Sequence, residues 1–260
     1  YAVQALAGEM DEPDYQLEII RYHNALYDPD FLGEEAWALL KKREFKDARE
    51  RAKRAITSAD LWQKRLGRNA LCAIESEAQE REAAVKACQD ALDATRKQDQ
   101  DDANKKPEER ITSSFAVDAY NTASALLQML RFQESEALLR EAVSHREFTI
   151  ANPWRSLAEI YIDEGRGQEA ASALRDMQSW RQRNPASLRD QDRALTDGTV
   201  ALFLLAAGEP TVGYKLVKRA IEMPDRHGLI SSNPEAIIGA HALLGRAMLR
   251  MHAERLREEA

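Results

Sequence analysis

The 260-residue sequence is poor in the residues on which several classes of protein depend. It has two cysteines, too few for a small disulfide-rich scaffold. No apolar run approaches the roughly 18 residues that a membrane-spanning helix needs. Basic residues are not in excess, because 37 Lys and Arg stand against 44 Asp and Glu, for a net charge of −7. A nucleic-acid-binding domain usually has a basic surface, so this balance disfavours one.

The motifs of common enzyme classes are also missing. The sequence contains no glycine-rich phosphate-binding loop, no G-x-S-x-G nucleophile motif and no H-E-x-x-H zinc motif. Among the five histidines, His241 and His252 fall on nearly the same helix face, but they lie about 16 Å apart along the axis. That distance is too long for a shared metal ion. We therefore expect no enzyme activity, no metal site and no cofactor.

Paired amphipathic segments are what the sequence does contain. The clearest pair begins with an apolar stripe at i, i+3, i+4 and i+7, the spacing of one helix face. This stripe consists of Trp154, Leu157, Ala158 and Tyr161, and a second helix repeats the spacing with Ala170, Leu174 and Met177. Between them, Gly165 and Gly167 are expected to let the backbone reverse at φ values closed to other residues. A pair this small cannot bury its apolar stripes alone, so further copies are expected.

Small residues recur at three equivalent positions when the other pairs are aligned to this one. The close-approach position of the first helix is occupied by Ala36, Cys72, Ala123, Ala158, Ala201 and Gly245. Its partner position on the second helix is occupied by Ala48, Ala84, Ser135, Ala170 and Gly213. A further second-helix position is occupied by Ala55, Ala91, Ala142, Met177 and Ala220. Only Met177 is large, so the aligned positions indicate tandem copies whose helices approach closely.

The best-formed copy resembles the tetratricopeptide repeat (TPR), because Trp154 to Leu174 reads W-x2-L-A-x2-Y-x3-G-x-G-x2-A-x3-L. It departs from the family pattern at Gly167, where the family usually has an aromatic residue. Glu75 departs from the large-residue pattern of the second copy. The resemblance implies an all-α fold, a right-handed α-solenoid of about five TPR-like helix pairs plus a C-terminal capping helix.

The copies are expected to fill residues 1–260 as a single TPR-like superhelical domain. The repeats are predicted at residues 29–62, 65–97, 116–149, 151–184 and 194–227, with the capping helix at 233–258. The almost wholly polar segment 98–110 is predicted to be a solvated insertion. We interpret residues 1–12 as the end of a helix from a preceding repeat, in which case the chain is a fragment of a longer array.

A basic stretch at residues 41–54 offers an alternative interpretation as a phosphate-contacting helix. Its apolar stripe, however, is that of a second helix in a pair, which leaves the charged residues on the other faces. Pairs such as Glu50 and Arg54, at i and i+4, would then stabilise one another. We favour the solvated face and expect no nucleic-acid partner.

The function implied by the resemblance is protein–protein interaction without catalysis. Stacked helix pairs twist into a superhelix whose first helices line a concave groove, which suits a peptide or partner protein. The chain would then act as a scaffold or adaptor. The alternative is a regulatory or sensor arm of a larger protein that acts on an attached enzyme or DNA-binding domain. The oligomeric state is left open.

The groove positions implied by the resemblance lie next to each close-approach residue and one turn to either side. The ligand-groove candidates are Trp37, Asn69, Tyr120, Asn121, Ser124, Gln128, Arg155, Glu159, Ile162, Arg246 and Arg250. Tyr120, Asn121 and Gln128 offer hydrogen bonds to a peptide backbone. Arg246 and Arg250 are suited to hold a carboxylate. The Lys-plus-Asn clamp of the chaperone-binding members is absent from the matching positions, so a C-terminal chaperone peptide is not expected.

Cys72 and Cys88 fall on the two helices of one copy and face the same interhelix layer in the alignment. We expect both to be buried, free and slowly reacting thiols. The chain is expected to be soluble and cytoplasmic rather than exported. A disulfide between the two cysteines would indicate export instead.

Overall fold

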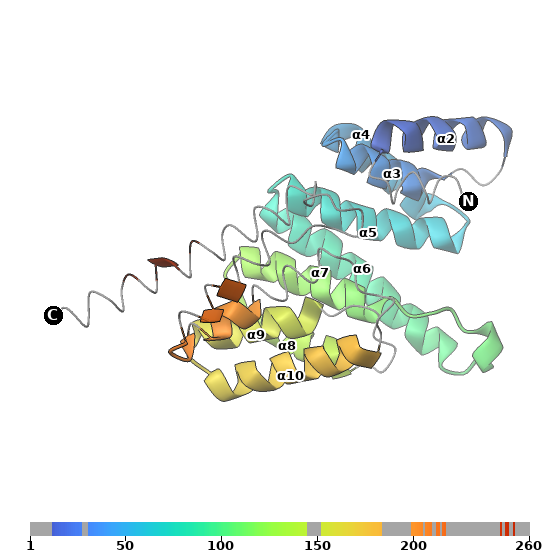
Figure 1. Ribbon diagram of the computed structural model, residues 1–260. Helices are drawn as coiled ribbons and strands as arrows, with labels where there is room; N and C mark the ends of the chain where they lie inside the picture. Colours follow the sequence, from blue (N-terminus) through green and yellow to red (C-terminus); the bar gives the residue numbers. More distant parts are fainter. Residues whose placement is uncertain are drawn as a thin grey trace. The chain divides into compact units, whose positions relative to one another are not determined.

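The computed structural model describes residues 12–27, 31–144, 152–183, 199–204 and 206–209, with short pieces up to residue 252. All regular secondary structure in these residues is helical, which confirms the all-α class for this part of the chain (Figure 1). The helices are α2 (Pro13–Leu26), α3 (Leu32–Lys41), α4 (Phe45–Thr57), α5 (Leu61–Glu77), α6 (Arg81–Asp102), α7 (Phe115–Gln128), α8 (Phe132–Ser144), α9 (Asn152–Asp163) and α10 (Gly167–Arg183), with a short 3-10 helix, η1 (Pro107–Glu109).

The chain divides into two compact units, Tyr1–Leu138 and Leu139–Ala260. In the first unit, each helix from α2 to α7 packs against the next one along the chain. Alternate helices also contact one another, α3 against α5 and α5 against α7. In the second unit, α9 packs against α10. The packing is therefore dominated by neighbours in sequence.

The same turn ends four of the helices. One residue with positive φ follows each of α3, α5, α7 and α9; these residues are Arg43, Gln79, Leu130 and Gly165. The next backbone N–H then donates to the carbonyl five residues earlier, as Arg166 does to Tyr161 at 2.7 Å. This is the Schellman arrangement, which satisfies carbonyl groups at a helix C-terminus. Gly165 has the positive φ expected from the sequence, whereas Gly167 is simply the first residue of α10.

The small residues of the aligned positions are buried, as predicted, with one exception among those described. The fully buried members are Ala36, Ala48, Ala55, Ala84, Ala123, Ser135, Ala142, Ala158, Ala170 and Ala201. The exception is Gly245, which is exposed with open space around it. Ala220 lies outside the described residues. Since a small side chain leaves room for the neighbouring backbone, these positions permit close helix pairing.

Gly67 marks a close approach of α4 and α5 that the alignment did not reveal. A Cβ atom added to Gly67 would lie 2.7 Å from the Cβ of Ala55 and 2.8 Å from the carbonyl oxygen of Ala52. Both distances are shorter than van der Waals contact. Only glycine therefore allows α5 to lie against α4 in this way.

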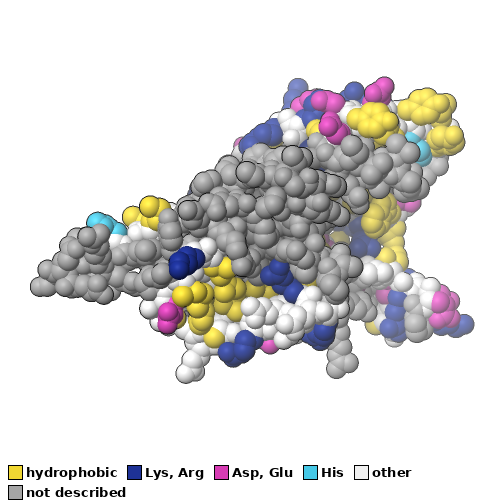
Figure 2. Space-filling view, in the orientation of Figure 1, with side chains coloured by type: hydrophobic (Ala, Val, Ile, Leu, Met, Phe, Trp, Pro, Cys, Tyr) yellow, Lys and Arg dark blue, Asp and Glu magenta, His cyan; other side chains and the backbone are white. Residues whose placement is uncertain are grey.

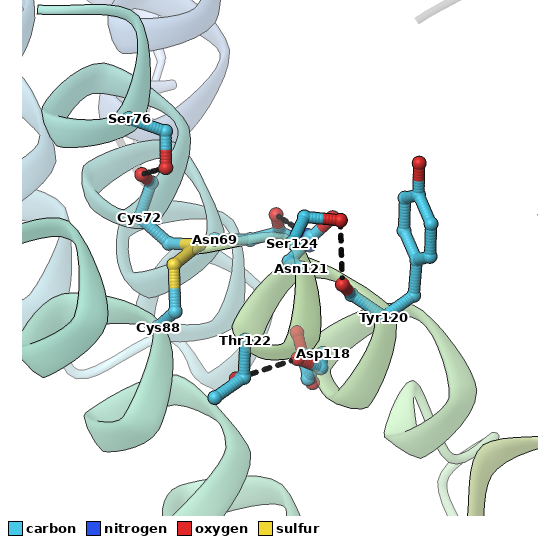
Figure 3. The surroundings of a disulfide bond; sticks show 9 residues. All are labelled: Asn69, Cys72, Ser76, Cys88, Asp118, Tyr120, Asn121, Thr122 and Ser124. Carbon is cyan, nitrogen blue, oxygen red and sulfur yellow. Dashed lines mark hydrogen bonds between the residues drawn. A yellow bond between two sulfur atoms is a disulfide. The ribbon is translucent and has the colours of Figure 1, made fainter. Parts of the chain in front are cut away.

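Cys72 on α5 and Cys88 on α6 form a disulfide, so the prediction of free thiols is wrong (Figure 3). Both cysteines are buried, as predicted. Their Cα atoms lie 4.6 Å apart, within the range that a disulfide requires. The alignment placed them in one interhelix layer, and close pairing of α5 and α6 brings their sulfur atoms within bonding distance.

The polar segment 98–110 is only partly a loop, which corrects the predicted insertion. α6 continues through Asp102, and the side chain of Asp102 is buried. Gln98 and the backbone N–H of Ile111 donate to its two carboxylate oxygens, and the Lys105 ammonium lies 2.6 Å from Oδ1. Apart from Gln98, Asp99 and Asp102, the side chains described in this segment are exposed, as the polar composition predicted.

Three cations of residues 41–54, namely Lys42, Arg49 and Arg51, pair with carboxylates on other helices. The Arg49 guanidinium contacts Glu75 on α5, and Arg51 contacts Glu35 on α3 at 3.1 Å. Within the described residues, Glu50 and Arg54 do not form the expected i, i+4 ion pair. The charges of α4 therefore help to hold α3 and α5 in place.

Candidate functional site

Three first helices, α3, α5 and α7, carry six of the groove candidates, all within the Tyr1–Leu138 unit. The candidates are Trp37 on α3, Asn69 on α5, and Tyr120, Asn121, Ser124 and Gln128 on α7. Trp37 is half-buried and packs against the core formed with α2 and α4. Gln128, the last residue of α7, is exposed. We call the surface formed by these six residues the first-helix face.

Asn69 and Asn121 connect α5 to α7 at the centre of the first-helix face. Nδ2 of Asn121 donates to Oδ1 of Asn69 at 3.2 Å, and both side chains are half-buried (Figure 3). This bond uses one polar group of each amide. The Asn69 NH2 group and the Asn121 carbonyl oxygen remain as a donor and an acceptor beside each other.

Tyr120 and Ser124 flank this amide pair on α7. The Ser124 hydroxyl donates to the Tyr120 carbonyl oxygen at 2.9 Å, so it bonds to its own helix. The Tyr120 ring is half-buried and points away from the Cys72–Cys88 disulfide (Figure 3). The first-helix face thus combines amide groups with an accessible aromatic ring.

The remaining groove candidates belong to the second unit, and they differ in their surroundings. Glu159 on α9 accepts a hydrogen bond from the Thr199 hydroxyl at 2.8 Å and lies 3.9 Å from Arg155. Ile162 is only 5% exposed, so it belongs to the core and not to an open face as the sequence predicted. Arg246 and Arg250 lie outside the described residues.

A pocket that the sequence did not reveal lies between α5, α6 and the start of α7. Its most buried polar residue is Asp118, whose Oδ2 accepts hydrogen bonds of 2.7 Å from the hydroxyls of Thr95 and Ser114. Burial raises the pKa of Asp118, and the two hydroxyls oppose this effect. A sequence signal existed in the run of hydroxyl residues, 112–114, just before α7.

An exposed hydrophobic stripe runs along α2 (Figure 2). It consists of Tyr15, Tyr22, Leu26 and the following Tyr27, each more than half exposed. The opposite side of α2 buries Leu17 and Ile20. This second apolar surface was not predicted from the sequence.

Metal-binding and membrane-spanning features are not found in the part of the chain that the structure describes. No group of three or more His, Cys, Asp or Glu residues there could hold a metal ion. No helix there is long and apolar enough to cross a membrane.

The sequence matches no protein-family model and no curated protein. The resemblance to TPR proteins therefore rests on the sequence motif alone.

Proposed function

We propose that the chain is a TPR-like right-handed α-solenoid that binds an extended peptide of a partner protein, without catalysis, as a scaffold or adaptor. The observation that carries this proposal is the adjacency of α3, α5 and α7, with the Asn69–Asn121 amide pair between two of them. The repeated Schellman turns and the buried small residues support the repeat interpretation, because both recur once per helix pair.

The polar groups of the first-helix face suit a peptide backbone. An extended peptide presents unpaired N–H and C=O groups, and the Asn69 NH2 group and the Asn121 carbonyl oxygen offer one partner for each. Tyr120 adds a large, rigid contact surface at low cost in side-chain entropy. Specificity for a particular sequence then depends on the side chains that flank this centre.

The disulfide favours an oxidising compartment over the cytoplasm that the sequence led us to expect. Structural disulfides persist in secreted, periplasmic or luminal proteins and are rare where thiols are kept reduced. The test is to count thiols in protein denatured directly from its source without a reductant. We expect neither Cys72 nor Cys88 to be labelled, whereas two labelled thiols per chain would place the protein in a reducing compartment.

Selection of random peptides displayed on phage, with the full chain as bait, tests the proposed function. Tyr120→Ala and Asn121→Ala should each lower the affinity for the selected peptides by about tenfold or more, as truncation of a central contact does. Tyr22→Ala and Gln133→Ala are matched controls, because these exposed residues lie on α2 and α8. Failure to select any peptide, or equal effects in both pairs of variants, would contradict binding at the first-helix face.

A further inference from the structure

The pocket between α5, α6 and α7 has charges of opposite sign on different helices. α5 contributes Arg65 and Arg68, while Asp99 comes from α6 and Asp118 from α7. The two positive and two negative groups balance. A ligand with one sign of charge would leave half of them uncompensated, whereas a zwitterion would match both.

The arginines keep donors available for a ligand. Among the described residues, no ion pair joins Arg65 or Arg68 to either pocket carboxylate. Arg65 donates to the backbone carbonyl of Thr112 at 3.1 Å and lies over the Trp62 ring. Arg68 makes no hydrogen bond or ion pair to any other described residue. Two guanidinium groups one turn apart on a helix form a ready carboxylate site.

Hydroxyl groups hold the carboxylates in place and bond to one oxygen of each. Thr95 and Ser114 both donate to Oδ2 of Asp118, and Ser113 donates to Oδ2 of Asp99 at 2.6 Å. In the described part of the chain, Oδ1 of Asp118 accepts no hydrogen bond. Asp118 is only 4% exposed, so this oxygen is a fixed acceptor inside the pocket. An ammonium group is the strongest partner for such an oxygen.

Part of the remaining lining is apolar. Leu66 of α5, Ala91 and Ala94 of α6, and Ile111 of the following segment contribute to its lining. Alanine side chains leave space that a short aliphatic group can fill. Burial of such a group adds about 0.8 kcal/mol per methylene to binding.

We propose that this pocket binds a free α-amino acid with an aliphatic side chain. The ligand carboxylate pairs with Arg68 and Arg65, and the ammonium group with Asp118 and Asp99. The side chain lies against Leu66 and the two alanines. Asn69 lines this pocket and also belongs to the first-helix face, so the two sites adjoin. The pocket gives the module a small-molecule ligand in addition to its protein partner.

Calorimetric titration of the full chain with L-leucine tests this proposal. N-acetyl-L-leucine carries only the negative charge and L-leucinamide only the positive one. Each should bind at least about tenfold more weakly than L-leucine, since each loses one set of charge-assisted hydrogen bonds. No saturable binding of L-leucine, or equal binding of all three compounds, would overturn the proposal.

Two variants assign the charges to their partners. Arg68→Gln should lower the affinity for L-leucine by about tenfold and leave the affinity for L-leucinamide unchanged. Asp99→Asn should lower the affinity for L-leucine and L-leucinamide but not for N-acetyl-L-leucine. This variant is preferred because it leaves the buried Asp118 in place. Arg54→Gln, an exposed change on α4 outside the pocket, is the control for charge. An equal effect of Arg54→Gln and Arg68→Gln would also overturn the proposal.

Discussion

Arg49 and Glu75 form a two-point ion pair between α4 and α5, with Nε to Oε1 and the terminal NH2 to Oε2, each at 2.7 Å. The carboxylate of Glu75 is buried, and its hydrogen bonds raise the pKa of Arg49. Glu75→Gln should lower the free energy of unfolding by about 1.5–3 kcal/mol, the usual value for hydrogen bonds to charged groups. Denaturant titration measures this loss.

Glu75→Leu provides the contrast, because it restores the large apolar residue that the repeat pattern calls for at this position. Arg49 is partly exposed and can turn its charge towards water when its partner is removed. We therefore expect Glu75→Leu to cost less than Glu75→Gln. If the two variants are equally destabilised, the hydrogen bonds do not account for the effect.

Gly67→Ala should destabilise the fold, although alanine normally stabilises a helix relative to glycine by about 0.5–1 kcal/mol. The added Cβ would meet the backbone of α4, which cannot move without separating the two helices. Gly167→Ala is the matched control, since it lies in α10 with open space around it. Thermal unfolding should show a lower melting temperature for the first variant and a higher one for the second.

The fold was predictable to the extent that it depends on local patterns. The spacing of Trp154, Leu157 and Tyr161 and the small residues at equivalent positions predicted helix pairs, and Gly165 predicted one of the turns. Gln79 and Leu130 adopt the same positive φ without being glycine, so composition alone could not identify their turns. The close contact at Gly67 could not be predicted from the sequence either, because it depends on which face of α4 packs against α5.

The site was less predictable, because its contacts join residues distant in sequence. Asn69 and Asn121 are both groove candidates, yet their hydrogen bond crosses 52 residues and required the positions of two helices. Asp118 was not a candidate, because the hydroxyl run at 112–114 does not by itself show that a carboxylate four residues later is buried. The disulfide was missed for a chemical reason: the alignment placed both cysteines together but carried no information on redox environment.

Reduction of the Cys72–Cys88 disulfide should lower the free energy of unfolding by about 3 kcal/mol. The bond closes a loop with a sequence separation of 16 residues. Opening the loop increases the conformational entropy of the unfolded chain, and this lowers the free energy of unfolding by about that amount. The measurement is denaturant unfolding with and without a phosphine reductant. The Cys72→Ala, Cys88→Ala double variant should show the same loss and no response to reductant. A reductant effect on the double variant would point to a different cause.

Leu130→Gly should stabilise the protein by about 1 kcal/mol, because a non-glycine residue at positive φ carries about 1–2 kcal/mol of steric cost. Leu130 is 72% exposed, so little packing is lost with its side chain. The reciprocal change, Gly165→Leu, should destabilise by a similar amount at the equivalent turn after α9. Melting temperatures of the two variants should therefore move in opposite directions. If they move together, the shared turn geometry is not the cause.

Asp102 should make the Tyr1–Leu138 unit less stable in acid. The Lys105 ammonium, with the Gln98 amide and the Ile111 N–H, lowers the pKa of Asp102 from 3.8 to about 2. The folded state therefore binds fewer protons than the unfolded state, and the contribution of Asp102 is fully present above about pH 5 and lost as pH falls from about 4 to 2. Urea unfolding across this range should show a pH dependence that Asp102→Asn reduces. Asp101→Asn, at the exposed neighbouring residue, should leave that dependence unchanged. Equal slopes for wild type and Asp102→Asn would show that the Lys105 pair does not form in solution.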